Sequence, residues 1–421
     1  TSLTTPQGDP TYHPGPLLFW LTAPAVHLLG AGAGTALTAA LINAGSILGM
    51  GWIGRRNASA RWGAAMMVAG GLALLALGGA SAGVAIHNPH VVVLPLLLTA
   101  FLAWGLSLGD DVLLPVLAFT GSLVVQADIV YAPIVAAVAL WALGSWWLGL
   151  RERAVPSRSG GSSGSRRTGP SMQWFVRRRA RRRPSGLIVG ELVFGIALVL
   201  VLAVVGTGTG PPIASGLVAA ARVAVTVTLA AIGLVLVAAF VVLAVATVVV
   251  VVRPVVRPLR NARGHVLAAT GVLLALVWLP PIIEALANEG GNLVALARAS
   301  TGSTQEVFGL SLAATVLARV LDPVPVFVAG LRTSDYGDAV GLAWLVPASV
   351  WCSLAWRARR RGDRGEVHLF VVAGLFVLAG CATAMRLPVS EGLALVHFLW
   401  VVDAVALVWL TLVLGAAHEL R

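Results

Sequence analysis

The sequence predicts an all-α, polytopic membrane protein, and three observations lead to this fold class. Hydrophobic residues make up 58% of the 421-residue chain and charged residues only 11%, which is far from the composition of a soluble domain. Apolar runs recur that are long enough to cross a bilayer, since a spanning helix needs about 20 apolar residues. The 29 basic residues are all arginine, and most of them gather in clusters between these runs. These observations together predict a bundle of membrane-spanning helices.

The apolar runs give the order of the predicted spans. They cover residues 33–53, 63–84, 91–108, 112–127, 130–149, 187–206, 214–252, 266–282, 338–356, 367–385 and 393–416. The run 214–252 is long enough to tilt, to extend past the bilayer or to contain a break. We therefore predict about eleven spans, with short helices in the loops of the outer face.

The arginine clusters predict the orientation of the bundle. Twenty-four of the 29 arginines fall on one face, at 55–61, 151–183, 253–263, 357–364 and Arg421. The other face holds four, which are Arg298, Arg319, Arg332 and Arg386, and one more lies within a span at Arg222. By the positive-inside rule the clusters are cytoplasmic and the remaining loops are external. The formal charge of +12 is then a membrane signal and gives no reason to expect nucleic acid.

Four segments follow from this pattern. Residues 1–149 form an outer loop and a first transmembrane bundle, 150–185 an Arg-rich cytoplasmic linker, 186–263 an added transmembrane hairpin, and 264–421 a second bundle. In the linker, a basic stop-transfer segment on anionic lipid is favoured over RNA binding. Cys352 and Cys381, the two cysteines, lie in apolar runs, so the sequence indicates neither a disulfide framework nor a metal site.

Polar residues of the outer loops are the main functional signal. The segments 9–13, 87–90, 126–128, 284–306 and 386–391 carry carboxylates, imidazoles and isolated arginines, and 322–338 is a sixth such segment. A simple helical scaffold does not need such loops, whereas an enzyme that works at the outer membrane surface does.

Several of these segments match one family in order. The motifs are His13-Pro14-Gly15-Pro16 through Ala23-Pro24, Asn88-Pro89-His90 with Leu94-Pro95, Ser122 to Gln126, Trp278 to Glu284, Gly291-Asn292-Leu293 and, more weakly, His397 to Trp400. Together they resemble bacterial integral-membrane glycosyltransferases of the GT-C class, relatives of the polyprenyl-phosphate-mannose protein mannosyltransferases. The resemblance covers about 1–150 and 264–300. Because the chain starts at Thr1 in a polar loop, we expect the family's first helix to lie upstream.

The resemblance implies transfer of a sugar from a polyprenyl-phosphate donor to a glycan or protein acceptor at the outer face. Its implied catalytic residues are Asp9, His13, Asp128 and Glu284. The family places an acidic residue in the first outer loop as the general base, and here only Asp9 occupies that loop. Asp128 stands where a His is expected, and Ala285 where a Gln often follows the Glu.

Breaking a sugar–phosphate bond also needs groups that hold the substrates and the departing phosphate. The candidate substrate-binding residues are Tyr12, Asn88, His90, Gln126, Asn292, Arg298, Arg332, Arg386, His397 and Trp400. Two simpler interpretations stay open. Glu284 would also complement a helix dipole, and the outer arginines would also snorkel to the interface. No cofactor is certain, and a divalent metal is an option that no ligand set supports.

A transporter or lipid-linked sugar flippase is the alternative function, and a noncatalytic scaffold is a third. A transporter would use Asp128 and Asp403, which lies within a predicted span, but the halves of the chain show no internal repeat. The enzyme hypothesis makes a geometric prediction. His13, Asp128 and Glu284 should converge on one cavity open to the outside, with an outer arginine at its rim.

Overall fold

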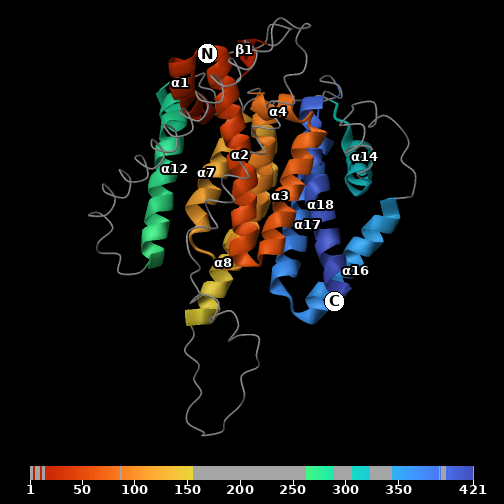
Figure 1. The fold of residues 1–421 in the computed structure, drawn as a ribbon. Coiled ribbons are helices and arrows are strands. Elements are labelled where there is room, and N and C mark those ends of the chain that lie inside the picture. Colours follow the sequence, from red (N-terminus) through yellow and green to blue (C-terminus); the bar gives the residue numbers. More distant parts are fainter. Residues whose placement is uncertain are drawn as a thin grey trace, which may run out of the picture.

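The computed structural model describes residues 3–4, 10–11, 15–85, 88–154, 262–287, 306–322, 344–387, 389 and 395–420. These residues form an all-α bundle of mostly antiparallel helices (Figure 1). The strands of the described part are Leu3–Thr4 (β1) and Pro10–Thr11 (β2), an antiparallel pair with Leu3 opposite Thr11. The predicted fold class is therefore confirmed as a helical bundle.

The helices follow the apolar runs of the sequence. Before residue 155 they are α1 Leu17–Leu29, α2 Ala31–Asn57, α3 Ala60–Ala76, α4 Ala80–Val84, α5 Asn88–Val91, α6 Val93–Ser107, α7 Leu113–Ala127, the 3-10 helix η1 Ile129–Tyr131 and α8 Ala132–Ala154. After residue 261 they are α12 Ala262–Ala287, α14 Gly309–Leu321, α16 Leu345–Arg361, α17 Arg364–Met385, the 3-10 helix η5 Leu395–Phe398 and α18 Trp400–Glu419.

Two ends of the bundle differ in the charges they carry. Long helices run back and forth between them, and the α2–α3 and α16–α17 turns share one end, which we call the Arg-rich end (Figure 1). Arg55, Arg56 and Arg61 lie at the first of these turns, and Arg359 to Arg364 at the second. The other end, called the α1 end, carries α1, α4, α5 and η1 (Figure 1). The charge asymmetry read from the sequence is thus an asymmetry between two ends of the described bundle.

Six helical segments are long and apolar enough to cross a membrane. They are Ala31–Asn57, Pro89–Ser107, Ile129–Gly149, Gly264–Leu286, Arg364–Met385 and Val396–Glu419. Two further predicted spans, 63–84 and 112–127, correspond to the shorter apolar helices α3 and α7. The predicted span 338–356 overlaps α16, whose last turns are rich in arginine. The predicted spans 187–206 and 214–252 lie outside the described residues.

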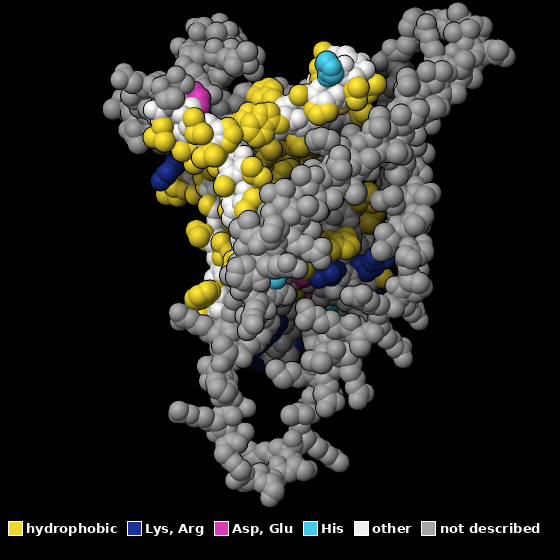
Figure 2. Space-filling view, turned by 90° about the vertical axis from the view of Figure 1, so that its left-hand side faces the viewer, with side chains coloured by type: hydrophobic (Ala, Val, Ile, Leu, Met, Phe, Trp, Pro, Cys, Tyr) yellow, Lys and Arg dark blue, Asp and Glu magenta, His cyan; other side chains and the backbone are white. Residues whose placement is uncertain are grey.

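Burial separates the core helices from those that border the lipid. Every residue of α6 is buried, and α18 is buried from Trp400 to Val408. By contrast, α8 and α12 expose large apolar side chains, among them Leu140 (70% exposed) and Leu276 (56%). Figure 2 shows that hydrophobic side chains cover much of the described surface on one side of the molecule. Such a surface suits hydrocarbon, so the structure supports a multi-pass membrane protein.

Local sequence signals set several helix ends. Gly30, at φ 79°, separates α1 from α2 in a backbone conformation that favours glycine. The Ser59 side chain caps α3 by accepting a hydrogen bond from Trp62 N, and Asp363 caps α17 by accepting one from Glu366 N at 3.1 Å. Gly362, at φ 70°, ends α16. These residues fix where the chain reverses at each turn.

Polar contacts at the Arg-rich end join turns of the first predicted bundle to one another, and one of them reaches the second bundle. Arg56 of α2 forms a bidentate ion pair with Asp110 in the α6–α7 turn. Trp146 Nε1 of α8 donates to Asp111 Oδ1 at 2.6 Å, and Trp104 Nε1 of α6 donates to the Gly365 carbonyl of α17 at 2.8 Å. Since α17 also packs on α8, and α18 on α3, the described parts of 1–149 and 264–421 form one body.

Close packing at Gly380 yields a first prediction. A Cβ atom at this position of α17 would lie 2.2 Å from the Trp400 ring, whereas a Cβ at Gly271 of α12 would meet nothing within 4 Å. We expect Gly380→Ala to destabilise the detergent-solubilised protein by ~1–3 kcal/mol through overpacking. Gly271→Ala is the matched control and should be neutral or slightly stabilising. Thermal unfolding of both variants checks this, and equal midpoints would contradict the packing argument.

Candidate functional site

Gln126 joins three parts of the chain at the α1 end. Its side chain is fully buried at the end of α7. Oε1 accepts a hydrogen bond from Leu17 N at the start of α1 (3.2 Å), and Nε2 donates to the Val277 carbonyl of α12 (3.0 Å). One amide side chain thus satisfies a backbone donor and a backbone acceptor that are far apart in sequence.

The residues around Gln126 come from the motifs that carry the family resemblance. Gly15 belongs to the His13 to Pro16 turn, and a Cβ atom there would lie 2.2 Å from Gln126 Oε1, so the turn needs a glycine at this point. Beside it, Trp278 Nε1 of α12 donates to Ser122 Oγ of α7 at 2.9 Å. Three motifs that are separated in the sequence therefore meet at one junction, which we call the Gln126 junction.

Asp128 follows Gln126 by two residues and begins η1. Its Oδ1 accepts a hydrogen bond from Val130 N at 3.0 Å, which caps the short helix. Burial raises the pKa of Asp128 to about 6, and the hydrogen bond from Val130 works against this rise. A carboxyl group with a pKa near 6 is suited to accept a proton close to neutral pH.

Tyr131 and Asp403 are two further buried polar residues of the bundle interior. Tyr131 is fully buried, and its hydroxyl donates to the Pro89 carbonyl at 3.4 Å. The carboxyl groups of Asp128 and Asp403 are both within electrostatic range of the Tyr131 phenol. Asp403 is also fully buried, and neither of its carboxyl oxygens has a hydrogen-bond partner among the described residues. A buried carboxyl group of this kind is a costly feature that usually has a function.

Five other predicted site residues lie on helices of the α1 end. Asn88 begins α5, and His90 is half-buried in the same helix. Glu284 is half-buried on α12, two turns after Val277. Arg386 is exposed at the end of α17. Trp400 is buried and donates from Nε1 to the His397 carbonyl at 3.1 Å.

Six predicted site residues lie outside the described residues. They are Asp9, Tyr12, His13, Asn292, Arg298 and Arg332. The predicted convergence of His13, Asp128 and Glu284 therefore stays a prediction. Gly15, two residues after His13, does contact Gln126, which is two residues before Asp128.

Tyr131 was not among the predicted residues. Its sequence signal is weak, since it is simply one of three tyrosines and follows Asp128 by three positions.

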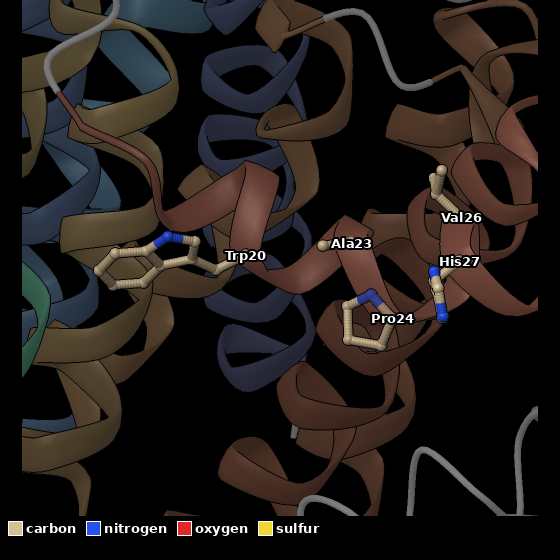
Figure 3. A pocket seen from close by; sticks show the side chains of 5 residues that line it. All are labelled: Trp20, Ala23, Pro24, Val26 and His27. Carbon is tan, nitrogen blue, oxygen red and sulfur yellow. The ribbon is translucent and has the colours of Figure 1, made fainter.

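An open apolar hollow lies on α1 itself (Figure 3). Trp20, Ala23, Pro24, Val26 and His27 line it, and of these Trp20 is 46% exposed. Neither Asp128 nor Glu284 is part of this lining. The hollow is a surface feature of a short apolar helix, and its lining is separate from the Gln126 junction.

One group at the Arg-rich end has the composition of a metal site. Asp363, Glu366 and His418 bring one ligand atom each within 4.8 Å of the others. Glu366 is already paired, however, with His418 Nδ1 at 2.7 Å and with Arg361 at 2.5 Å. The arginine supplies the positive charge that a metal ion would bring, so the group fits an ion-pair network better than a metal centre.

Comparison of the chain with known protein families, with curated proteins and with solved structures finds no match. The function is therefore inferred from the side chains and contacts of the α1 end.

The Gln126 junction gives a second prediction. Gln126→Leu keeps much of the side-chain volume but leaves Leu17 N and the Val277 carbonyl unpaired, which should cost ~1–3 kcal/mol for each buried group. Thermal unfolding of the solubilised variant measures the loss. Ser122→Ala, which removes only the partner of the Trp278 indole, should lower the unfolding midpoint less. If Gln126→Leu unfolds like the wild type, Gln126 does not hold the junction.

Asp128 gives a third prediction, on pH and stability. Its pKa of about 6 in the folded protein lies above the ordinary value of 3.8. Between these values the folded state binds the extra proton, so the free energy of unfolding should fall as pH rises from about 4 to about 6. Asp128→Asn removes this contribution, whereas Ser122→Ala, which has no titratable group, should retain it. Parallel midpoint-against-pH curves for Asp128→Asn and the wild type would refute the assignment.

Proposed function

We propose that the chain is a membrane glycosyltransferase of the GT-C type, which transfers a sugar from a polyprenyl-phosphate donor to an acceptor at the outer membrane surface. The observation that carries this proposal is the Gln126 junction. The His13 to Pro16 turn, the Ser122 to Gln126 motif and the Trp278 to Glu284 helix are distant in sequence, yet the first contacts Gln126 through Gly15 and the last bonds Ser122 through Trp278. Their meeting at one place is what a shared substrate site requires.

The proposed roles follow from the chemistry of each side chain. Asp128 accepts the proton of the acceptor hydroxyl, because its pKa of about 6 leaves it ionised at neutral pH and still basic. Arg386 is exposed at the same end and can hold a phosphate through two parallel N–H donors. In this proposal Asp9 and His13 complete the site from the first outer loop, and Glu284 completes it from the last turn of α12. The donor is a polyprenyl-phosphate sugar, and the acceptor is a glycan or a protein.

The orientation is part of the same proposal. The α1 end faces the outside of the cell membrane, and the Arg-rich end faces the cytoplasm, as the positive-inside rule predicts from the arginine clusters. A lipid-linked donor presents its sugar at the membrane surface, which is where Asp128 begins η1 next to the candidate span Ile129–Gly149.

The fourth prediction tests the activity. The full chain in vesicles should release polyprenyl phosphate from a radiolabelled polyprenyl-phosphate sugar and transfer the sugar to an added acceptor. Asp128→Asn should lower the rate about 10²–10⁴-fold. The wild-type rate should rise with pH through about 6, as Asp128 ionises. Asp322→Asn, at the exposed end of α14, is the matched control and should keep the wild-type rate.

Two outcomes would count against the enzyme. If Asp128→Asn transfers the sugar at the wild-type rate, Asp128 is not the catalytic base and another residue must accept the proton. An absence of sugar transfer across a panel of polyprenyl-phosphate hexoses and pentoses, by protein that is folded and correctly inserted, would reject the glycosyltransferase proposal.

A transporter or lipid-linked sugar flippase is the second candidate, and the buried Asp403 favours it. Carboxyl groups inside membrane helices are rare, and where they occur they often mark ion pathways and proton relays. The same vesicles separate the two functions. A flippase would move the intact lipid-linked sugar between leaflets, and Asp403→Asn would abolish this movement, whereas a transferase would break the sugar–phosphate bond.

A further inference from the structure

The C-terminal half of α16 has two different faces. Arg357 and Arg361 are four residues apart and so share one side of the helix. On that side Arg357 bonds Glu419 of α18 at 3.0 Å, and Arg361 bonds both Glu419 and Glu366. This side is therefore neutralised by carboxylates of α17 and α18.

The adjoining part of this exposed side carries positive charge without such neutralisation. Trp356 and Arg360 are also four residues apart, and the Arg360 guanidinium lies over the Trp356 ring, 4.7 Å from its centroid. Arg359 and Arg360 are exposed, and Trp356 is 56% exposed. Neither Arg359 nor Arg360 forms an ion pair with a carboxylate of the described residues. We call Trp356, Arg359 and Arg360 the α16 patch.

An apolar surface precedes the α16 patch on the same helix. Leu345 is 43% exposed, Val346 68% and Val350 47%. The helix extends along the side of the bundle to the Arg-rich end (Figure 1). Along α16 the exposed side chains therefore change from aliphatic to tryptophan to arginine. Hydrocarbon, interface and headgroups follow one another in the same order at a membrane surface.

We propose that the α16 patch binds the phosphate of an anionic phospholipid headgroup. The planar guanidinium groups of Arg359 and Arg360 offer paired N–H donors to phosphate oxygens, and the Trp356 ring holds Arg360 in place. The aliphatic residues one to three turns earlier lie where the acyl chains of that lipid would run. RNA would also meet the arginines, but it would leave Val346 and Val350 uncovered, so the lipid accounts for more of the exposed surface.

The fifth prediction measures lipid binding to the full chain. In an uncharged detergent, native mass spectrometry counts phosphatidylglycerol and phosphatidylcholine molecules retained by the protein. Arg360→Ala should weaken phosphatidylglycerol binding about fivefold, and the Arg359→Ala/Arg360→Ala double variant about 25-fold, from the usual attraction of one arginine to an anionic surface. Phosphatidylcholine binding should change little. Arg319→Ala on α14 removes one charge elsewhere and should leave both lipids bound as in the wild type.

Further variants separate binding from folding. Arg359→Lys/Arg360→Lys keeps the charge and should retain more phosphatidylglycerol than the alanine pair. Trp356→Phe should retain more than Trp356→Ala, because the phenyl ring still supports Arg360. Unchanged phosphatidylglycerol binding in the alanine pair, with unchanged thermal unfolding, would overturn the proposal. A second outcome would also overturn it: the wild type binds a single-stranded RNA oligonucleotide more tightly than it binds phosphatidylglycerol, and the alanine pair abolishes RNA binding but leaves lipid binding unchanged.

Discussion

The two buried hydrogen bonds of Gln126 are the interaction on which the α1 end depends. The Leu17 N–H at the start of α1 has no partner within its own helix, because the first backbone donors of any helix lack one. The Val277 carbonyl of α12 is bonded by the same side chain. Replacing Gln126 by an apolar residue would leave both groups unpaired in the buried interior of the bundle. The junction therefore fixes how α1 enters the bundle and where α12 stands beside α7.

Charge is handled differently at the two ends. At the Arg-rich end, carboxylates neutralise arginines in pairs and networks, such as Arg56 with Asp110 and Arg361 with Glu366 and Glu419. At the α1 end, Asp128 and Asp403 are both within electrostatic range of Tyr131, and no described arginine is bonded to either carboxyl group. The paired charges of the Arg-rich end suit a structural role, whereas the carboxyl groups of the α1 end are not neutralised by a described arginine. The metal-like group of Asp363, Glu366 and His418 belongs to the Arg-rich end, where Arg361 already provides the counter-charge.

The number of spans shows where sequence reasoning reaches its limit. Apolar length located every described long helix, but length cannot tell a helix that crosses the bilayer from a shorter one within the bundle. The apolar helices α3 and α7 are 17 and 15 residues long, and α16 ends in a run of arginines. Buried helices are also apolar all round, so α6 and the more exposed α12 look alike in sequence. Their difference lies in what surrounds them.

The sequence by itself determined the all-α class, the membrane character and the separation of arginines from the outer polar residues, because these depend on composition and on the spacing of apolar residues. It also marked Gln126 and Asp128 as unusual polar residues at a helix end. Only the tertiary structure decided that Gln126 bonds Leu17 and Val277, that Glu366 is paired with Arg361, and that the Tyr131 phenol is within electrostatic range of both Asp128 and Asp403. The hydrogen bond from Gln126 to Val277 joins residues 151 positions apart. Such contacts depend on how whole helices pack, which no local pattern encodes.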